Sequence, residues 1–138
     1  MNVLIVGCGR VGAETAQILS AAGHNVTVLD KSEAAFQRLG ADFNGATLVG
    51  NGIDMETLRA AGVDKADAAA VVTNGDNTNI VAAQVIQKIF KVPKVLTRIY
   101  DPGRAHIYKQ LGLAVVSGTT LFATLLHDRI VEGKQCSL

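Results

Sequence analysis

A glycine-rich segment close to the N-terminus has the residue types and the spacing of an anion-binding loop. It follows a short apolar run, 3–6, and reads Gly7-Cys8-Gly9-Arg10-Val11-Gly12. In a G-x-G-x-x-G turn between a strand and a helix, the first glycine makes the tight turn, the second lets the backbone approach a pyrophosphate, and the third lets the helix pack closely. Amide N–H groups at the start of that helix then face the anion. We therefore predict that this loop binds the phosphates of a dinucleotide.

A carboxylate at the end of the second apolar run completes the pattern. Asp30 follows the run 26–29, and a carboxylate in this place can accept hydrogen bonds from both ribose hydroxyls of an adenosine. Its charge repels a 2′-phosphate, so this residue favours NAD over NADP. The alternative is a glycine turn needed only for chain reversal, with Asp30 as a helix-capping acid.

Two side chains inside the loop call for different interpretations. Arg10 has no steric reason to be there, and its planar guanidinium suits phosphate oxygens or a carboxylate of a neighbouring subunit. The alternative for Arg10 is a solvated surface arginine. Cys8 has no acid or base beside it in the sequence, so we interpret it as a small filler and not as a reactive thiol.

Further polar clusters follow the later apolar runs, and ligands of parallel sheets bind beyond the carboxyl ends of the strands. The clusters are Gly50-Asn51-Gly52, Thr73-Asn74-Gly75-Asp76 and Arg98. The asparagines can donate to and accept from an adenine or a ribose, and the arginine can reach a phosphate. Taken singly, each has another interpretation: Asn-Gly pairs form turns, Asp76 or Thr78 caps a helix, and Arg98 pairs with Asp101. Their shared position favours a ligand site.

Short apolar runs alternate with helical stretches along the chain, and these elements must position the polar residues. The runs predict strands at 3–6, 26–29, 47–49, 68–72, 95–99 and 114–116. The stretches between them predict helices at 11–22, 32–39, 55–61, 77–90, 104–111 and 121–131. Continuous apolarity indicates strands covered on both faces, and alternation gives parallel strands with right-handed crossovers. We predict one α/β domain over 1–138, a Rossmann-like doubly wound six-stranded parallel sheet with helices on both faces.

Three helix features are expected from local sequence. Gly23 is placed to end the first helix. Ser32 precedes Glu33 and is expected to be an N-cap followed by a favourable acid. The last helix has an apolar stripe wider than one sheet face requires, formed by Leu121, Phe122, Leu125, Leu126 and Ile130. Either this helix is an ordinary covering helix, or its second face pairs with another subunit.

Composition narrows the classes of function. The chain has 138 residues, of which 49% are hydrophobic, and this suffices for one sizeable core. Its 13 Lys plus Arg and 12 Asp plus Glu give a net charge of +1, so no long-range field favours nucleic acid. Cys8 and Cys136 form no disulfide or metal-ligand pattern, and the histidines are scattered. We expect no metal site, a reducing compartment and no membrane-spanning helix.

Beyond this general pattern, the residues resemble the regulatory nucleotide-binding domain of potassium transport proteins, the family called TrkA-N, KTN or RCK. The resemblance covers nearly the whole chain. It rests on the glycine loop with Arg10, Leu29-Asp30-Lys31, Gly50-Asn51-Gly52-Ile53-Asp54, Leu58-Arg59-Ala60-Ala61-Gly62-Val63, Ala66-Asp67-Ala68, Thr73-Asn74-Gly75-Asp76-Asn77-Thr78-Asn79 and Thr97-Arg98-Ile99-Tyr100-Asp101-Pro102.

The resemblance implies a cytoplasmic subunit, peripheral to the inner face of the membrane, that forms homodimers or rings beneath a potassium channel or transporter. Such a subunit gates potassium transport according to the nucleotide bound, which is NAD or NADH, or alternatively ADP, ATP or AMP. The glycine loop would hold phosphates, Asp30 the adenosine ribose with Lys31 beside it, and the Asn51 region the adenine. The residues implied to hold the nucleotide are Gly7, Cys8, Gly9, Arg10, Val11, Gly12, Asp30, Lys31, Asn51, Gly52, Thr73, Asn74 and Arg98.

The chain departs from the family at two positions. The family usually has Asp where this chain has Asn51, and Glu is common where it has Asn77.

We also expect the C-terminal ligand-binding subdomain of the family to be absent, because the sequence stops shortly after the sixth strand and its helix. No Lys follows Tyr100 or Tyr108 by four residues, which excludes the short-chain dehydrogenase arrangement. Because neither a proton donor nor a substrate pocket is evident in the sequence, we expect no enzyme activity. The alternatives to gating are a free-standing nucleotide sensor and an NAD-dependent oxidoreductase.

Overall fold

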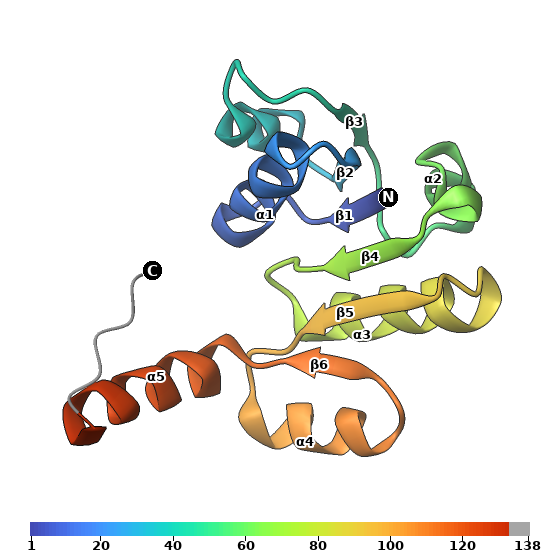
Figure 1. Cartoon of the computed structure of the whole chain (residues 1–138). Coiled ribbons are helices and arrows are strands. Elements are labelled where there is room, and N and C mark those ends of the chain that lie inside the picture. Colours follow the sequence, from blue (N-terminus) through green and yellow to red (C-terminus); the bar gives the residue numbers. More distant parts are fainter. Residues whose placement is uncertain (133–138) are drawn as a thin grey trace.

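A computed structural model describes residues 1–132 and shows a six-stranded sheet (Figure 1). The strands are β1 (Asn2–Val6), β2 (Asn25–Asp30), β3 (Ala46–Val49), β4 (Ala68–Val71), β5 (Lys94–Arg98) and β6 (Ala114–Val116). Their order is β3-β2-β1-β4-β5-β6, and every neighbouring pair is parallel. The predicted doubly wound fold is therefore confirmed: strands are added in one direction from β1 to β3 and in the other from β4 to β6, so the strand order reverses between β1 and β4.

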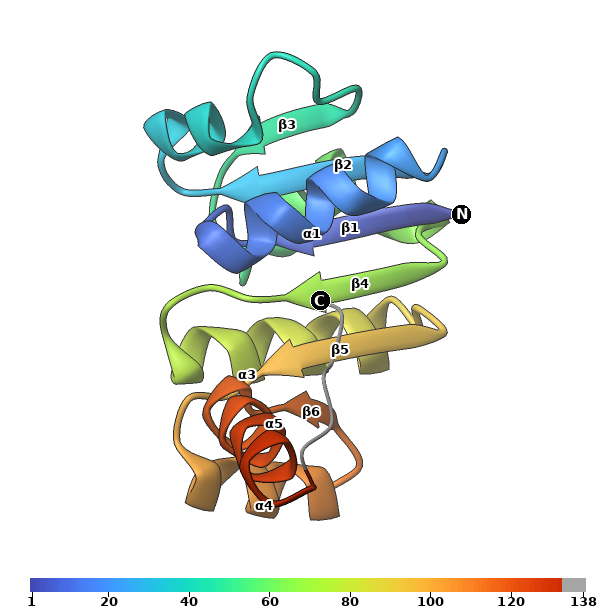
Figure 2. The ribbon, with the colours of Figure 1, turned by 60° about the vertical axis from the view of Figure 1, so that its left-hand side comes forward.

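Helices connect these strands. They are α1 (Arg10–Ala21), η1 (Glu33–Leu39), α2 (Met55–Ala60), η2 (Val63–Lys65), α3 (Asp76–Gln84), η3 (Val85–Ile89), α4 (Pro102–Gln110) and α5 (Gly118–Glu132). η1 and η2 are 3-10 helices, and η3 is a π-helical continuation of α3. In Figure 2, α1 and η1 lie in front of the strands β1 to β3, whereas α3 lies behind β4 and β5.

Alternating side chains of β1 build the two halves of the core. Val3 and Ile5 pack with residues of β2, α1 and η1 in one buried cluster. Leu4 and Val6 point to the opposite face, where they pack with α2, β4 and α3 in a second cluster. Because a strand turns successive side chains to opposite faces, β1 can be covered on both sides only if it is apolar throughout. This confirms the interpretation of the first apolar run.

The outer strands do not follow this rule, so the expectation that all strands are covered on both faces is wrong. In β5, Val95 and Thr97 are buried, whereas Lys94 and Leu96 are exposed. Leu96 is 44% exposed and Val116, on the neighbouring strand β6, is 41% exposed. The helices α1 and η1 extend over the β1 to β3 half of this face, and within residues 1–132 no helix packs on it at β5.

The residues at the helix ends agree in part with the capping residues predicted from the sequence. Gly23, with φ +93, follows α1 and donates its amide to Ser20, as expected of a residue that ends a helix. Ser32 stands at the N-cap of η1 and Glu33 follows in the first turn, as expected, but the Ser32 side chain makes no capping hydrogen bond. The Asp30 carboxylate instead accepts a hydrogen bond from the Ser32 amide. Asp101 caps α4 through the Gly103 amide, and Pro102 occupies the first turn.

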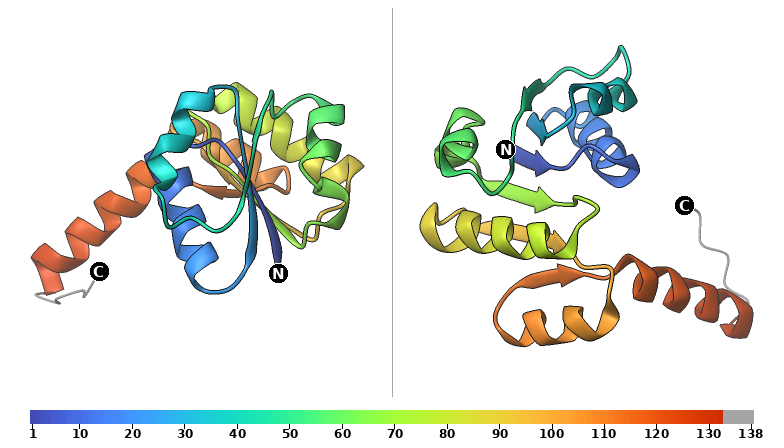
Figure 3. Two further views of the ribbon diagram at one scale, coloured as in Figure 1. Left: turned by 90° about the horizontal axis from the view of Figure 1, so that it is seen from above. Right: turned by 180° about the vertical axis from the view of Figure 1, so that it is seen from behind.

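Helix α5 extends away from the body of the domain, beyond the carboxyl end of β6 (Figure 3). None of its residues is buried. The interpretation of this segment as an ordinary covering helix is therefore wrong for the described chain. None of the helices described in the structure is long and apolar enough to cross a membrane. Cys136 lies outside the described residues, so the expectation for it stays a prediction.

Candidate functional site

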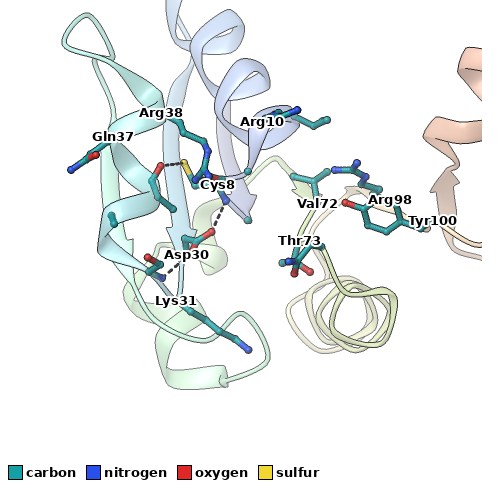
Figure 4. A pocket seen from close by; sticks show the side chains of 17 residues that line it. Cys8, Arg10, Asp30, Lys31, Gln37, Arg38, Val72, Thr73, Arg98 and Tyr100 are labelled. Atoms are coloured by element: carbon teal, nitrogen blue, oxygen red, sulfur yellow. Dashed lines mark hydrogen bonds between the residues drawn. The ribbon is translucent and has the colours of Figure 1, made fainter.

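A cavity of about 920 Å³ opens at the carboxyl ends of the central strands, where the glycine loop faces β2, β4 and β5. Figure 4 shows Asp30, Cys8 and Arg38 on one side of it and Arg98 and Tyr100 on the other. The predicted residues that line this cavity are Gly7, Cys8, Gly9, Arg10, Val11, Asp30, Lys31, Thr73, Asn74 and Arg98. The structure thus gathers most of the predicted site in one place.

The three glycines of the loop stand in different surroundings. Gly7 has φ +107, and a Cβ atom there would lie 2.8 Å from the Thr73 amide nitrogen. A methyl group at Gly12 would overlap the Gly7 carbonyl oxygen and lie 3.2 Å from Val72 Cγ2. Gly9, at the N-cap of α1, has open space where its Cβ would be. Gly7 and Gly12 are therefore required by the fold of the loop, whereas Gly9 keeps the backbone open toward the cavity.

Asp30 ties the end of β2 to the glycine loop. Its Oδ2 accepts a hydrogen bond of 2.7 Å from the Cys8 amide, and its Oδ1 accepts one of 2.8 Å from the Ser32 amide. Each carboxylate oxygen has a second lone pair available to a further donor. The side chain is half-buried and lines the cavity. It can therefore shape the loop and still accept hydrogen bonds from a ligand hydroxyl.

Cys8 connects the loop to η1. Its side chain is fully buried, its Sγ donates to the Ala35 carbonyl at 3.3 Å, and its carbonyl accepts from Arg38 at 3.3 Å. Burial raises the pKa of the Cys8 thiol, the Asp30 carboxylate raises it further, and Arg38 opposes the shift. A thiol that stays protonated at neutral pH packs as a small apolar group.

Positive side chains surround the rest of the cavity. Arg10, Lys31, Arg38 and Arg98 line it together with Asp30. The guanidinium of Arg98 lies 4.2 Å from the centre of the Tyr100 ring, a cation–π arrangement. The alternative pairing of Arg98 with Asp101 is not formed. Four cations against one carboxylate favour an anionic ligand such as a phosphate.

Three of the predicted residues do not line this cavity. Asn51 does not line the cavity, because its Oδ1 accepts a hydrogen bond from the Ile53 amide at 3.2 Å and closes a local turn. The predicted contact of the Asn51 region with adenine therefore stays a prediction. Gly12 is buried in the first turn of α1, against the Gly7 carbonyl group. Gly52 lines a smaller cavity of about 120 Å³, which shares Asp30, Lys31 and Asn74 with the first.

The segment after β4 has a structural role that differs from helix capping. Gly75, and not Asp76 or Thr78, occupies the N-cap of α3. The carboxylate of Asp76 accepts hydrogen bonds from the Tyr100 amide at 2.8 Å and from the Asp101 amide at 3.2 Å. It therefore holds the β5–α4 loop, which carries the Tyr100 ring, against the start of α3.

Several residues that line the cavity were not predicted from the sequence. They are Ser32, Ala34, Ala35, Gln37, Arg38, Val72 and Tyr100. Tyr100 follows β5 at the same sheet edge as Arg98, so the rule that selected Arg98 could have found it. Arg38 carried no such signal, because η1 is a 3-10 helix and the α-helical spacing would not place its side chains correctly. Among residues 1–132, no group of three or more His, Cys, Asp or Glu is arranged to hold a metal.

The sequence matches that of a known protein family. The family model described as the TrkA-N domain matches residues 3–118. A protein named Trk system potassium uptake protein TrkA, from Streptomyces coelicolor, is 48% identical over 131 residues. The match covers 95% of this chain and 59% of the relative, so the chain spans about three fifths of that relative's length.

Solved structures with the same architecture include nucleotide complexes. One, described as Shewanella denitrificans Kef CTD in AMP bound form, has a TM-score of 0.81 at 23% identity and covers 98% of this chain and 84% of its own. Another, described as GsuK channel bound to NAD, has a TM-score of 0.79 at 23% identity and covers 96% of this chain and 23% of its own. At this level of identity the likeness concerns the fold.

Proposed function

Because this chain belongs to the TrkA-N domain family, we propose that it binds an adenine nucleotide and regulates potassium transport according to the nucleotide bound. The ligand is NAD or NADH, with ADP, ATP and AMP as the alternatives. The relative in Streptomyces coelicolor is named as part of a potassium uptake system. The role proposed here is therefore binding and regulation at the cytoplasmic side of a membrane channel or transporter, and not catalysis.

The proposal rests on one observation: the glycine loop, the Asp30 carboxylate and four cationic side chains all line the same cavity. The loop leads into the N-terminus of α1 at this cavity, and Asp30 lies beside the loop at the end of β2. A pyrophosphate fits the amides and the arginines, and a ribose diol fits the carboxylate. We propose that Gly7, Gly9, Arg10 and Asp30 make these contacts.

A binding domain regulates a pore when the ligand has different affinities for two conformations. The cavity is walled by the ends of four elements, namely the β1–α1 loop, β2 with η1, β4 and β5. A ligand that contacts all of them favours the arrangement in which they are closest. The strands β5 and β6 then connect this change to α5, which points away from the domain.

Mass spectrometry of nucleotide released from the purified full chain, followed by calorimetry with NAD, NADH, ADP, ATP and AMP, tests the proposal. We expect saturable binding of at least one of them with one site per chain. Binding should weaken as salt increases, because cations contribute to it. The absence of binding for all five nucleotides would overturn the proposal. Co-purification with a membrane pore protein would separate a transport regulator from a free-standing sensor.

We further propose that two copies of the chain associate through α5. Phe122 and Ile130 are 63% and 81% exposed on this helix, which is unusual for large apolar residues grouped together. The uncovered face of β5 and β6, with Leu96 and Val116, is a second apolar surface of the same chain. A two-fold dimer can bury both kinds of surface at once.

The expected result is a dimer in sedimentation equilibrium and mostly monomer for Phe122→Asp, because a charge in an apolar interface remains desolvated and unpaired. Ile18→Asp is the matched control, since Ile18 is also 63% exposed but lies on α1. It should leave the dimer intact. A wild-type chain that remains monomeric at high concentration, or equal dissociation by both substitutions, would count against this interface.

A further inference from the structure

We infer that Asn79 is a positioning residue that fixes Thr73 and Arg98 relative to each other on the side of the cavity opposite Asp30. This inference rests on the proposed nucleotide binding. It concerns recognition of the part of the ligand beyond the first phosphate, on the side of the cavity opposite Asp30. Asn79 does not line the cavity itself, so its effect on a ligand must pass through the two residues that do.

The side chain of Asn79 is fully buried and has all of its polar atoms paired. Its Oδ1 accepts from the Thr73 amide at 3.0 Å and from the Thr73 hydroxyl at 2.5 Å. Its Nδ2 donates to the Thr73 carbonyl at 3.1 Å and to the Arg98 carbonyl at 2.8 Å. One amide group thus connects the backbone after β4 to the last residue of β5.

This bridge begins where the sheet ends. The paired residues of β4 and β5 stop at Val71 opposite Thr97. Beyond that pair, the segments after β4 and β5 separate toward α3 and α4, and the Asn79 side chain connects them by hydrogen bonds in place of backbone pairing. A carboxamide is needed, because it supplies both an acceptor and two donors at one site. Aspartate would keep the acceptor side and lose both donors.

Both ends of the bridge matter to the cavity. The Thr73 backbone abuts Gly7 so closely that a Cβ atom on Gly7 would lie 2.8 Å from the Thr73 nitrogen. Arg98 stacks on the ring of Tyr100, whose amide is held by Asp76. A shift at Asn79 would therefore change the spacing between the glycine loop and the Arg98–Tyr100 pair, while Asp30 and its bonds to Cys8 and Ser32 stay in place.

The test compares ligands of different length on the full chain carrying Asn79→Asp. We expect the affinity for NADH and ADP to fall about tenfold or more, the size of a lost hydrogen bond with a buried unsatisfied group. The affinity for AMP, which lacks the part of the ligand beyond the first phosphate, should change by less than about twofold. Asn77→Asp is the matched control, because Asn77 is exposed. This substitution adds the same charge two residues away and leaves the hydrogen bonds of Asn79 intact. It should behave as the wild type.

Thr73→Val is the second variant, since it removes the hydroxyl bond to Asn79 and leaves the buried amide unchanged. It should give a smaller loss with the same dependence on ligand length, and its melting temperature shows whether it is folded. Equal loss for AMP and NADH would mean that Asn79 only stabilises the fold, and unchanged NADH binding would mean that the bridge does not position the site. Either result overturns the inference. A wild-type chain that binds none of these ligands overturns the proposed function instead.

Discussion

Gly12→Ala is expected to lower the free energy of unfolding by about 3 kcal/mol, the upper part of the range for overpacked sites. The added methyl group would overlap the Gly7 carbonyl oxygen and lie 3.0 Å from its carbonyl carbon. Backbone atoms cannot rotate away as a flexible side chain can, so α1 must move away from the loop. Nucleotide binding should be lost together with stability, because the amides of the loop move with the helix. Urea denaturation and calorimetry measure the two effects.

Gly9→Ala is the matched control, because it makes the same chemical change in the same loop. No atom lies within 4 Å of a Cβ at Gly9, and its φ of −81 suits alanine. The free energy of unfolding should be unchanged or rise by about 0.4–1 kcal/mol through the lower entropy of the unfolded chain. If Gly9→Ala weakens nucleotide binding at full stability, the methyl group obstructs the ligand. Equal stability of Gly12→Ala and Gly9→Ala would refute the steric account of the loop.

Asp30→Ala is expected to weaken nucleotide binding by about tenfold to a hundredfold, because charged hydrogen bonds contribute roughly 1.5–3 kcal/mol each. The substitution removes the acceptor for the ribose and also the bonds to the Cys8 and Ser32 amides. The loop and the start of η1 lose their common anchor. The wild type should bind NADPH more weakly than NADH, and this difference should shrink in the variant because the repulsion of the 2′-phosphate is gone.

Asp67→Ala separates the ligand effect from a general loss of stability. Asp67 also accepts a hydrogen bond from a backbone amide, that of Asn2 at 2.8 Å, but at the opposite end of the sheet. Its replacement should cost a similar amount of stability and leave the nucleotide affinity unchanged. Unchanged NADH affinity in Asp30→Ala would exclude the ribose contact.

The order of the elements and most of the cavity could be predicted from the sequence, because both follow from local rules. The apolar runs were continuous and bounded by turn residues, and the predicted strands match the observed ones to within one residue at each end. The backbone geometry of the loop requires Gly7 and Gly12 at fixed spacing, and Asp30 ends the second strand. The spacing of these residues in the sequence therefore predicts their positions. Arg98 was found because it ends a strand at the ligand edge.

What the sequence could not predict depends on contacts between distant segments. Asn79 gives no signal of its own in the chain, because its partner Arg98 is 19 residues away and the bond is to a carbonyl group that every residue has. Arg38 donates to the Cys8 carbonyl from η1, a 3-10 helix that the apolar pattern does not distinguish from an α-helix. The exposed face of β5 follows from the positions of α1 and η1 on the other half of the sheet, which no single strand records.

The slender attachment of α5 has a mechanical consequence. The helix starts at Gly118, one residue after the three-residue strand at the edge of the sheet. Its 15 residues have a length of about 22 Å at 1.5 Å per residue. A rotation of about 10° at Ser117 therefore sweeps the distal end through roughly 4 Å, a lever arm that amplifies sub-ångström adjustments near the sheet. Small rearrangements around a bound anion become displacements large enough to move a neighbouring molecule.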